Sequence, residues 1–217
     1  MATIKNIIFD YGNVIYNIDF SLAQQAWTAL GIQNVESFFG HGQQNALFDA
    51  FDKGEITAAQ FRDQIRLITG NDNLTDKQID DAWNSMLLTV QPGTHDLLLQ
   101  LKASYRTFLL SNINAIHYDH IMGQLKREFD FEGNDHLFEK VYYSHFMGMR
   151  KPNSNIFEFV LQDSNLDPAE TLFIDDSPQH LATAGKLGIQ THLLKSPSML
   201  KEFLQKENLL PWLLPFW

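Results

Sequence analysis

Side chains that could take part in catalysis come at four points along the chain. They are Asp10 at the end of IIFD, Ser111 and Asn112 in FLLSN, Lys151 in GMRKP, and Asp175 with Asp176 in LFIDD. Three carboxylates in one pocket repel each other unless a cation joins them, and hard oxygen ligands without cysteine favour Mg²⁺. A hydroxyl and an ammonium group suit a phosphate, and a carboxylate in line with phosphorus could act as a nucleophile and form an aspartyl-phosphate.

These residues can meet only if the strands that carry them are parallel. From Pro92-Gly93 onward, helical and strand patterns alternate, with helices at about 93–102, 114–125, from 153 and from 178, and strands at about 105–110, 140–144, 171–174 and 188–194. Such alternation predicts βαβ crossovers and a mostly parallel sheet. The carboxyl ends of parallel strands share one edge of the sheet, where the four groups of side chains would converge. The predicted fold class is α/β, with a Rossmann-like three-layer core.

The segment between the first strand and Val90 is predicted to be helical almost throughout. SLAQQAWTALG has helical periodicity, ITAAQFRDQIRLITG begins at a Thr57 cap and ends at Gly70, and LTDKQIDDAWNSMLL begins at a Thr75 cap. We therefore predict an α/β core of residues 1–16 and 91–217, and an inserted helical subdomain of residues 17–90. Trp27 and Trp83 are expected in the apolar core of that subdomain.

Composition excludes several classes of protein. The 217 residues carry a net charge of -10 and no cluster of Lys or Arg, which argues against nucleic-acid binding. The absence of cysteine excludes disulfides, thiolate catalysis and Cys-ligated zinc, and fits a reducing compartment. No apolar run approaches the length of a membrane span, and MATIKNIIFD leaves no room for a signal peptide. A cytoplasmic location without membrane binding is the prediction.

The four segments, in this order, resemble the motifs of the haloacid dehalogenase-like hydrolase superfamily. FDYGNV is similar to the first motif, LLSN to the second, GMRKP to the third and FIDDS to the fourth. The resemblance covers nearly all of the chain, and the helical insertion after the first motif resembles the first-type cap of this superfamily.

The resemblance implies a role for each matching residue. Asp10 matches the nucleophile, which is also a metal ligand. Ser111, with Asn112 beside it, matches the hydroxyl that binds the transferring phosphoryl group. Lys151 matches the cation that holds the nucleophile and the phosphoryl oxygens.

The remaining matches concern the metal. Asp175 and Asp176 match the acidic pair that binds Mg²⁺ directly or through water, with Asp176 favoured as the direct ligand. Gly12 matches the position whose backbone carbonyl binds the metal. Gly12 and Asn13 are also expected to form a turn with unusual backbone angles.

The first motif departs from the usual pattern at Gly12. Phosphatases of this superfamily usually carry a second Asp there, which acts as general acid and base, a contribution of about 10²–10⁴-fold. A similar Gly-Asn motif occurs in a branch that includes sugar-phosphate phosphatases. The replacement for this acid is left open, with His41 in FFGHG and Asp19 at the cap entrance as candidates. His41 is also a candidate contact for the substrate.

The leading hypothesis is a Mg²⁺-dependent phosphatase of a small phosphorylated metabolite, with sugar phosphates among the candidates, acting as a monomer or homodimer. One alternative is a 2-haloacid dehalogenase that uses Asp10 without a metal, although the Asp175-Asp176 pair argues against it. Another is a weakly active or non-catalytic binding protein, suggested by Gly12 alone.

Two further features leave alternatives open. His117 and His120 lie three apart on a predicted helix, and without a third ligand in view they are expected to be surface histidines rather than a metal pair. The C-terminal LLPWLLPFW, with Trp212 and Trp217, is expected to pack on the domain or on a partner, with local packing favoured.

Overall fold

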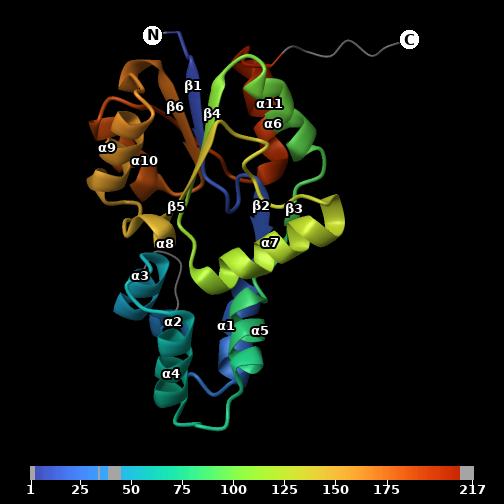
Figure 1. The fold of residues 1–217 in the computed structure, drawn as a ribbon, viewed down its shortest axis with the longest axis vertical. Coiled ribbons are helices and arrows are strands. Elements are labelled where there is room, and N and C mark those ends of the chain that lie inside the picture. The colour runs from blue at the N-terminus through green and yellow to red at the C-terminus, as the bar shows by residue number, and fades with distance from the viewer. Residues whose placement is uncertain (1–2, 34, 39–44, 211–217) are drawn as a thin grey trace.

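A five-stranded parallel sheet forms the centre of the molecule, and the α/β fold class predicted from the sequence is confirmed (Figure 1). The computed structural model describes residues 3–33, 35–38 and 45–210. The strands lie in the order β5 (Lys140–Tyr143), β4 (Arg106–Ser111), β1 (Asn6–Phe9), β6 (Thr171–Asp175) and β7 (Gln190–Leu193). All four pairings are parallel, so every strand ends at the same edge.

Successive side chains of each strand point to opposite faces of this sheet, and both faces are apolar. Helices therefore cover both faces. Ile8 and Phe173 point to the cluster that contains Phe157, while Ile7 and Phe9 belong to the cluster on the opposite face. The first face is covered by α9 (Ser154–Asp163) and α10 (Pro178–Lys186), and the second by α6 (Thr94–Lys102) and α11 (Leu200–Lys206) (Figure 1). The core therefore has three layers.

The cap helices lie beyond the edge where the strands end (Figure 1). They are α1 (Phe20–Ala29), α2 (Val35–Phe38), α3 (Ala46–Asp52), α4 (Ala58–Thr69) and α5 (Asp76–Asn84). Thr57 and Thr75 cap α4 and α5 with complete capping boxes, as their sequences predict. Trp27 and Trp83 are buried with their ring centroids 5.8 Å apart, so the prediction that they form the core of the cap is confirmed.

The prediction of a helix through Leu88 was wrong. Helix α5 ends at Asn84, and β3 (Leu87–Val90) pairs antiparallel with β2 (Tyr16–Ile18). Backbone hydrogen bonds fix both ends of this two-stranded ribbon. Asp19 N donates to Met86 O and Gln91 N donates to Ile15 O, each with an N–O distance of 2.9 Å. Tertiary pairing overrides the local helical preference here.

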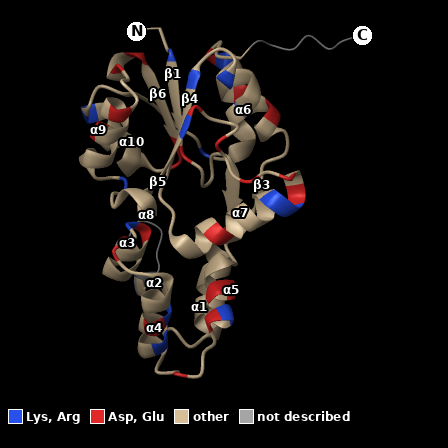
Figure 2. Ribbon diagram, in the orientation of Figure 1, with Lys and Arg blue, Asp and Glu red and all other residues tan. Residues whose placement is uncertain are grey.

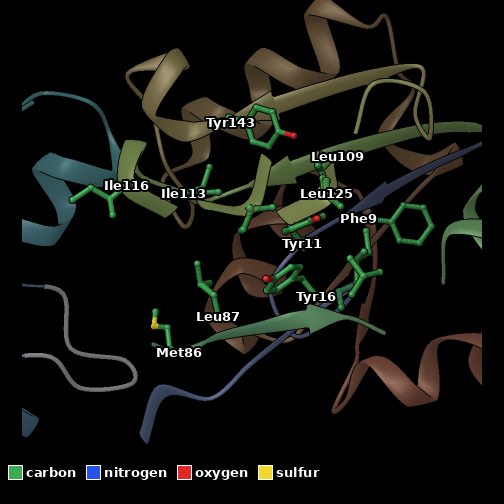
Figure 3. Packing of buried hydrophobic residues seen from close by; sticks show 14 of the residues in the cluster. Phe9, Tyr11, Tyr16, Met86, Leu87, Leu109, Ile113, Ile116, Leu125 and Tyr143 are labelled. Atoms are coloured by element: carbon green, nitrogen blue, oxygen red, sulfur yellow. The ribbon is translucent and has the colours of Figure 1, made fainter. Parts of the chain in front are cut away.

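The ribbon lies where core and cap meet, and its side chains are part of the main apolar cluster. Figure 3 shows Tyr16 of β2 and Leu87 of β3 near Tyr11 and Ile113, which follow β1 and β4. The predicted boundaries at 16/17 and 90/91 fall within β2 and at the end of β3. The division into core and cap at those residues remains a prediction.

Three shorter differences concern the core. The predicted strand KVYYS ends at Tyr143, and Ser144 instead begins α8 (Ser144–Met147). Helix α7 (Ala115–Phe129) continues four residues beyond the predicted end. Two 3₁₀ helices, η1 (Pro168–Glu170) and η2 (Pro197–Met199), and helix α11 were not predicted.

The distribution of charged side chains and the length of the helices bear on nucleic-acid and membrane binding. Lys and Arg are scattered over several elements among the more numerous acids (Figure 2). Among the described residues, no helix combines the length and the apolar composition needed to cross a membrane.

Helix α3 of the cap docks tightly on the core next to α8. Ser144 Oγ donates a 2.5 Å hydrogen bond to the backbone carbonyl of Asp52, at the end of α3. Gly54 follows with a φ of 67°, and a Cβ atom at this position would lie 2.3 Å from the carbonyl oxygen of His145. This close approach of two backbones requires glycine.

We predict that Gly54→Ala destabilises the protein more than Gly70→Ala. Both glycines have left-handed backbones, which cost alanine about 1–2 kcal/mol, but a Cβ at Gly70 would have no atom within 4 Å. The difference between the two variants measures the backbone contact with His145. Thermal unfolding of both, with equal losses of Tm, would show that α3 does not rest on α8 in solution.

Candidate active site

Three adjacent strands bring the predicted site residues to one edge of the sheet. Asp10 directly follows β1 and its N–H donates to Ile174 O of β6 over 2.9 Å, while Ser111 ends β4 and Asp175 ends β6. Oxygens of Asp10, Asp175 and Asp176 all lie within 4.8 Å of one another. The parallel sheet thus assembles three carboxylates and a hydroxyl from residues up to 166 positions apart in the chain.

Lys151 lies between two of these carboxylates. Its side chain is fully buried, and Nζ lies 2.8 Å from Asp10 Oδ1 and 2.7 Å from Asp175 Oδ2. Asn112 holds the backbone of Lys151 from both sides: its Oδ1 accepts from Lys151 N over 2.9 Å, and its Nδ2 donates to Lys151 O over 2.8 Å. The Asn112 carboxamide therefore positions the lysine, and its contact with phosphate stays a prediction.

The carboxylate of Asp175 is bound by other groups of the protein, whereas Asp176 lines the pocket. Asp175 Oδ1 accepts from Ser177 N over 2.7 Å, and His180 Nδ1 lies 3.0 Å from it. Although burial acts in the opposite direction, Lys151 and His180 lower the pKa of Asp175 to about 2. Asp176 and Asp10 line the pocket, which favours Asp176 over Asp175 as a direct metal ligand.

The charge balance fits a divalent cation. Burial raises the pKa of Asp10 above its usual value, against the opposing effect of Lys151. Burial and the neighbouring carboxylates of Asp10 and Asp175 raise the pKa of Asp176 to about 7. One ammonium group is thus insufficient for three carboxylates, and a hard cation between the oxygens would favour their ionised forms. These residues form the cluster of potential metal ligands found in the described part of the chain.

The turn after Asp10 differs from the sequence prediction in one respect. Asn13, with a φ of 53°, has the left-handed backbone, and Gly12 does not. Asn13 Oδ1 also accepts from Ile18 N over 3.1 Å. A Cβ at Gly12 would lie 2.7 Å from Cδ1 of Ile18, the far end of a flexible side chain. A side chain at position 12 therefore requires Ile18 to change rotamer, whereas the backbone angles of Gly12 do not oppose it.

A pocket of about 490 Å³ extends from these carboxylates to the cap. Its core end includes Asp10, Ser111 and Asp176. Its apolar lining includes Phe48 and Trp83 of the cap. Its polar lining includes Asp49 and Asp52 of α3 with Arg150 and Asn114 of the core.

The other sequence candidates lie elsewhere or have other partners. Asp19 caps α1, accepting from Ser21 N over 2.9 Å and Ser21 Oγ over 2.6 Å, and it is not part of the pocket lining. His41, Trp212 and Trp217 lie outside the described residues. As a result, neither candidate for the missing acid is supported by a contact with the site.

His117 is not a surface residue, which corrects the prediction. Its ring stacks on Trp83 at 4.4 Å between centroids, and Nε2 lies 3.1 Å from Trp83 O. Burial lowers the pKa of His117 to about 3, so the ring is neutral in the pocket wall. His120 is partly buried and belongs to no potential metal cluster among the described residues.

The polar cap-side residues of the pocket were missed by sequence analysis. Asp49 and Asp52 are spaced i,i+3 on a helix whose Phe48 and Phe51 are buried, so the spacing could have placed both carboxylates on one face. Arg150 directly precedes Lys151 in GMRKP and could have been noted for that reason. Their convergence required the docking of α3 on the core.

Comparison with known proteins agrees with this geometry. Residues 4–188 match the family model of the haloacid dehalogenase-like hydrolases. The chain is similar to a D-ribitol-5-phosphate phosphatase of Bacteroides thetaiotaomicron, with 35% identity over 192 residues that cover 87% of this chain and 90% of that protein.

Solved structures give the same result. A haloacid dehalogenase family enzyme of B. thetaiotaomicron, in complex with magnesium and inorganic phosphate, is 40% identical, with a TM-score of 0.79 and coverage of 89% of this chain and 95% of that one. A 2-haloacid dehalogenase of Pseudomonas syringae shares 13% identity at a TM-score of 0.55, covering 94% of this chain and 100% of its own, a likeness of fold alone.

We predict that Lys151→Met costs about 3–5 kcal/mol of stability in metal-free buffer, because it leaves two buried carboxylates without their counterion. Denaturant unfolding measures this change. Lys77→Met is the matched control, since Lys77 pairs with Asp81 on the exposed side of α5 and should contribute little. Equal stability of both variants would contradict the buried ion pairs.

Proposed function

The chain belongs to the haloacid dehalogenase-like hydrolases, and we propose that it is a Mg²⁺-dependent phosphatase that hydrolyses a small phosphorylated metabolite. The observation that carries this proposal is the position of Asp10. Its carboxylate lines the pocket, is held by buried Lys151, and lies within 4.8 Å of two further carboxylates. Such a group is oriented for attack on a bound phosphate ester.

The residues of the site divide the reaction between them. A carboxylate oxygen of Asp10 attacks phosphorus, and the bond from phosphorus to the alcohol oxygen breaks, which gives an aspartyl-phosphate and an alkoxide that takes a proton from solvent water to become the alcohol. Ser111 donates to the phosphoryl group, and Lys151 balances its charge while it orients Asp10. Water then attacks phosphorus, which releases phosphate and restores the Asp10 carboxylate.

Magnesium would be held by oxygens of Asp10 and Asp176 and by the carbonyl of Gly12, with Asp175 acting through water. When bound, it polarises the phosphoryl oxygens and neutralises their charge. The raised pKa values of Asp10 and Asp176 support this assignment, since both acids lack a sufficient countercharge from the protein alone. The magnesium and phosphate bound by the similar enzyme of B. thetaiotaomicron support it as well.

The two alternatives have less support. A 2-haloacid dehalogenase that works without metal has no use for Asp176, whose carboxylate would repel an anionic substrate in the pocket. A non-catalytic protein would not need Lys151 buried against Asp10 and Asp175, because an unused buried charge is costly. The similarity to a D-ribitol-5-phosphate phosphatase supports a sugar or polyol phosphate as substrate. A cytoplasmic location and a monomeric or homodimeric state remain predictions from the sequence.

The proposal is tested by phosphate release from p-nitrophenyl phosphate. We expect turnover in Mg²⁺ and none after exhaustive chelation, with activity restored when Mg²⁺ is added back. Asp10→Asn should abolish turnover while thermal unfolding shows an intact fold, because an amide cannot form the acyl phosphate. A folded Asp10→Asn variant with wild-type turnover would exclude Asp10 as the nucleophile. Turnover of a 2-haloacid without metal would favour the dehalogenase.

We predict that Gly12→Asp raises the rate on alkyl phosphates by up to about 10²-fold, and more than the rate on aryl phosphates, because it supplies a general acid for poor leaving groups. The structure admits the side chain if Ile18 changes rotamer, so Ile18→Val in the same chain should increase the gain. Gly12→Asn is the matched control, with the same size and no proton to donate. Equal effects of Gly12→Asp on both substrate types would contradict the prediction.

A further inference from the structure

The pocket has a charged wall that the hydrolysis of the phosphate bond does not use. We call Asp49, Asp52 and Arg150 the cap-side wall. All three line the same pocket as Asp10, at the end formed by α3. The nucleophile, Lys151 and the metal ligands lie at the end formed by the sheet. A substrate whose phosphate lies at Asp10 would place its leaving group between these two ends.

The wall is held in place by contacts between cap and core. Arg150 forms ion pairs with both Asp49 and Asp52, the latter over 3.6 Å. Asn114 Nδ2 donates to Asp52 Oδ1 over 3.2 Å, and Ser144 Oγ holds the Asp52 backbone. The three side chains of the wall are mostly buried, with exposed fractions of 14% for Arg150, 29% for Asp49 and 18% for Asp52. Their positions are therefore set before any ligand enters.

The wall retains hydrogen-bonding capacity after these contacts. Arg150 Nε is buried and has no hydrogen-bond partner among the described residues. A carboxylate offers about four acceptor positions, and the ion pairs and the Asn114 bond occupy only part of them. Burial also raises the pKa of Asp52 to about 7. A buried donor without an acceptor is costly, and an oxygen of a bound ligand would satisfy it.

This combination of donors and acceptors matches hydroxyl groups, each of which both donates and accepts. Two acidic side chains disfavour a second phosphate or carboxylate on the substrate. Phe48 and Trp83 also line the pocket and offer apolar surface for the carbon chain.

Resting on the phosphatase function proposed above, we propose that the cap-side wall makes the enzyme selective for phosphates of polyhydroxylated carbon chains. Asp49 and Asp52 accept hydrogen bonds from hydroxyls of the leaving group, and Arg150 donates to one of them. A site built to bind hydroxyls rejects an analogue without them because its own polar groups are then left unpaired.

The test compares three five-carbon substrates with the wild-type holoenzyme: ribitol 5-phosphate, n-pentyl phosphate and 5-aminopentyl phosphate. We expect kcat/KM for the polyol phosphate to exceed that for the pentyl phosphate by about tenfold or more, as hydrogen bonds to charged groups allow. A ratio near one would overturn the proposal. Preference for the ammonium-bearing substrate would overturn it too, because the wall would then select a cation.

Asp49→Asn assigns the selectivity to the wall. We expect it to lower kcat/KM for ribitol 5-phosphate about tenfold or more, mainly through KM, and to lower the values for n-pentyl phosphate and p-nitrophenyl phosphate by a much smaller factor. Asp63→Asn is the matched control, since Asp63 is an exposed acid of the cap outside the pocket and pairs with Arg66. Equal losses on all substrates would show that Asp49 only supports the fold and would overturn the assignment.

The two proposals fail in different ways. If wild-type enzyme with Mg²⁺ hydrolyses none of the esters, including p-nitrophenyl phosphate, the phosphatase function is wrong. If it hydrolyses the aryl ester and does not discriminate between the polyol and alkyl phosphates, only the role of the cap-side wall is wrong. The comparison of wild-type substrates decides the second point even if Asp49→Asn does not fold.

Discussion

The buried ammonium group of Lys151 is the interaction on which the site depends. It lies within 2.8 Å of carboxylate oxygens from two strands, Asp10 after β1 and Asp175 at the end of β6. Without it, two carboxylates would share a space with little solvent, and the ends of these strands would repel each other. Removing one partner of such a buried group is strongly destabilising. The requirement to hold the lysine there explains why Asn112 clamps its backbone with both ends of its carboxamide.

One lysine does not neutralise three acids, and this imbalance links the structure to metal binding. Asp175 keeps its charge because Lys151 and His180 both lie against it. Asp176 lines the pocket, and its raised pKa reflects burial and the charges of the other two acids. The site therefore holds one acid, Asp175, with Lys151 and His180, and leaves two acids, Asp10 and Asp176, on the pocket wall. A bound cation would complete the charge balance of these two.

Much of the core end of the site could be predicted from the sequence because its position depends on the order and direction of the strands. The chain alternates between helix and strand, so the ends of β1, β4 and β6 had to share one edge, and Asp10, Ser111 and Asp175 are found there. The same reasoning could not predict β3, because its pairing with β2 joins residues about 70 positions apart and the local pattern favoured a helix. Likewise, nothing in the spacing of His117 shows that Trp83, from another helix, covers its ring.

The cap end was missed for a related reason. In the sequence alone, nothing distinguishes Asp49 and Asp52 from acids on the exposed face of a helix, or Arg150 from a basic residue in an exposed loop. They meet where α3 docks on the core, with Gly54 allowing the close approach to the backbone at His145 and Arg150 pairing with both acids. A contact of this kind depends on how α3 docks on the core. In the sequence, only the i,i+3 spacing of Asp49 and Asp52 indicates that both acids share one face of the helix.

Ile18 connects these observations to the missing acid at position 12. Its side chain fills the space where a Cβ of Gly12 would lie, and its backbone N–H is held by Asn13. Since Ile18 belongs to β2, the ribbon that leads into the cap occupies the volume that a general acid would need beside Asp10. Core and cap thus meet, among other contacts, at an apolar contact next to Asp10 and at a charged contact at α3. In the proposed reaction, the first contact occupies the space of an acid at position 12, and the second places the cap-side wall beside the leaving group. The requirements placed on the leaving group then depend on residues of the core–cap junction.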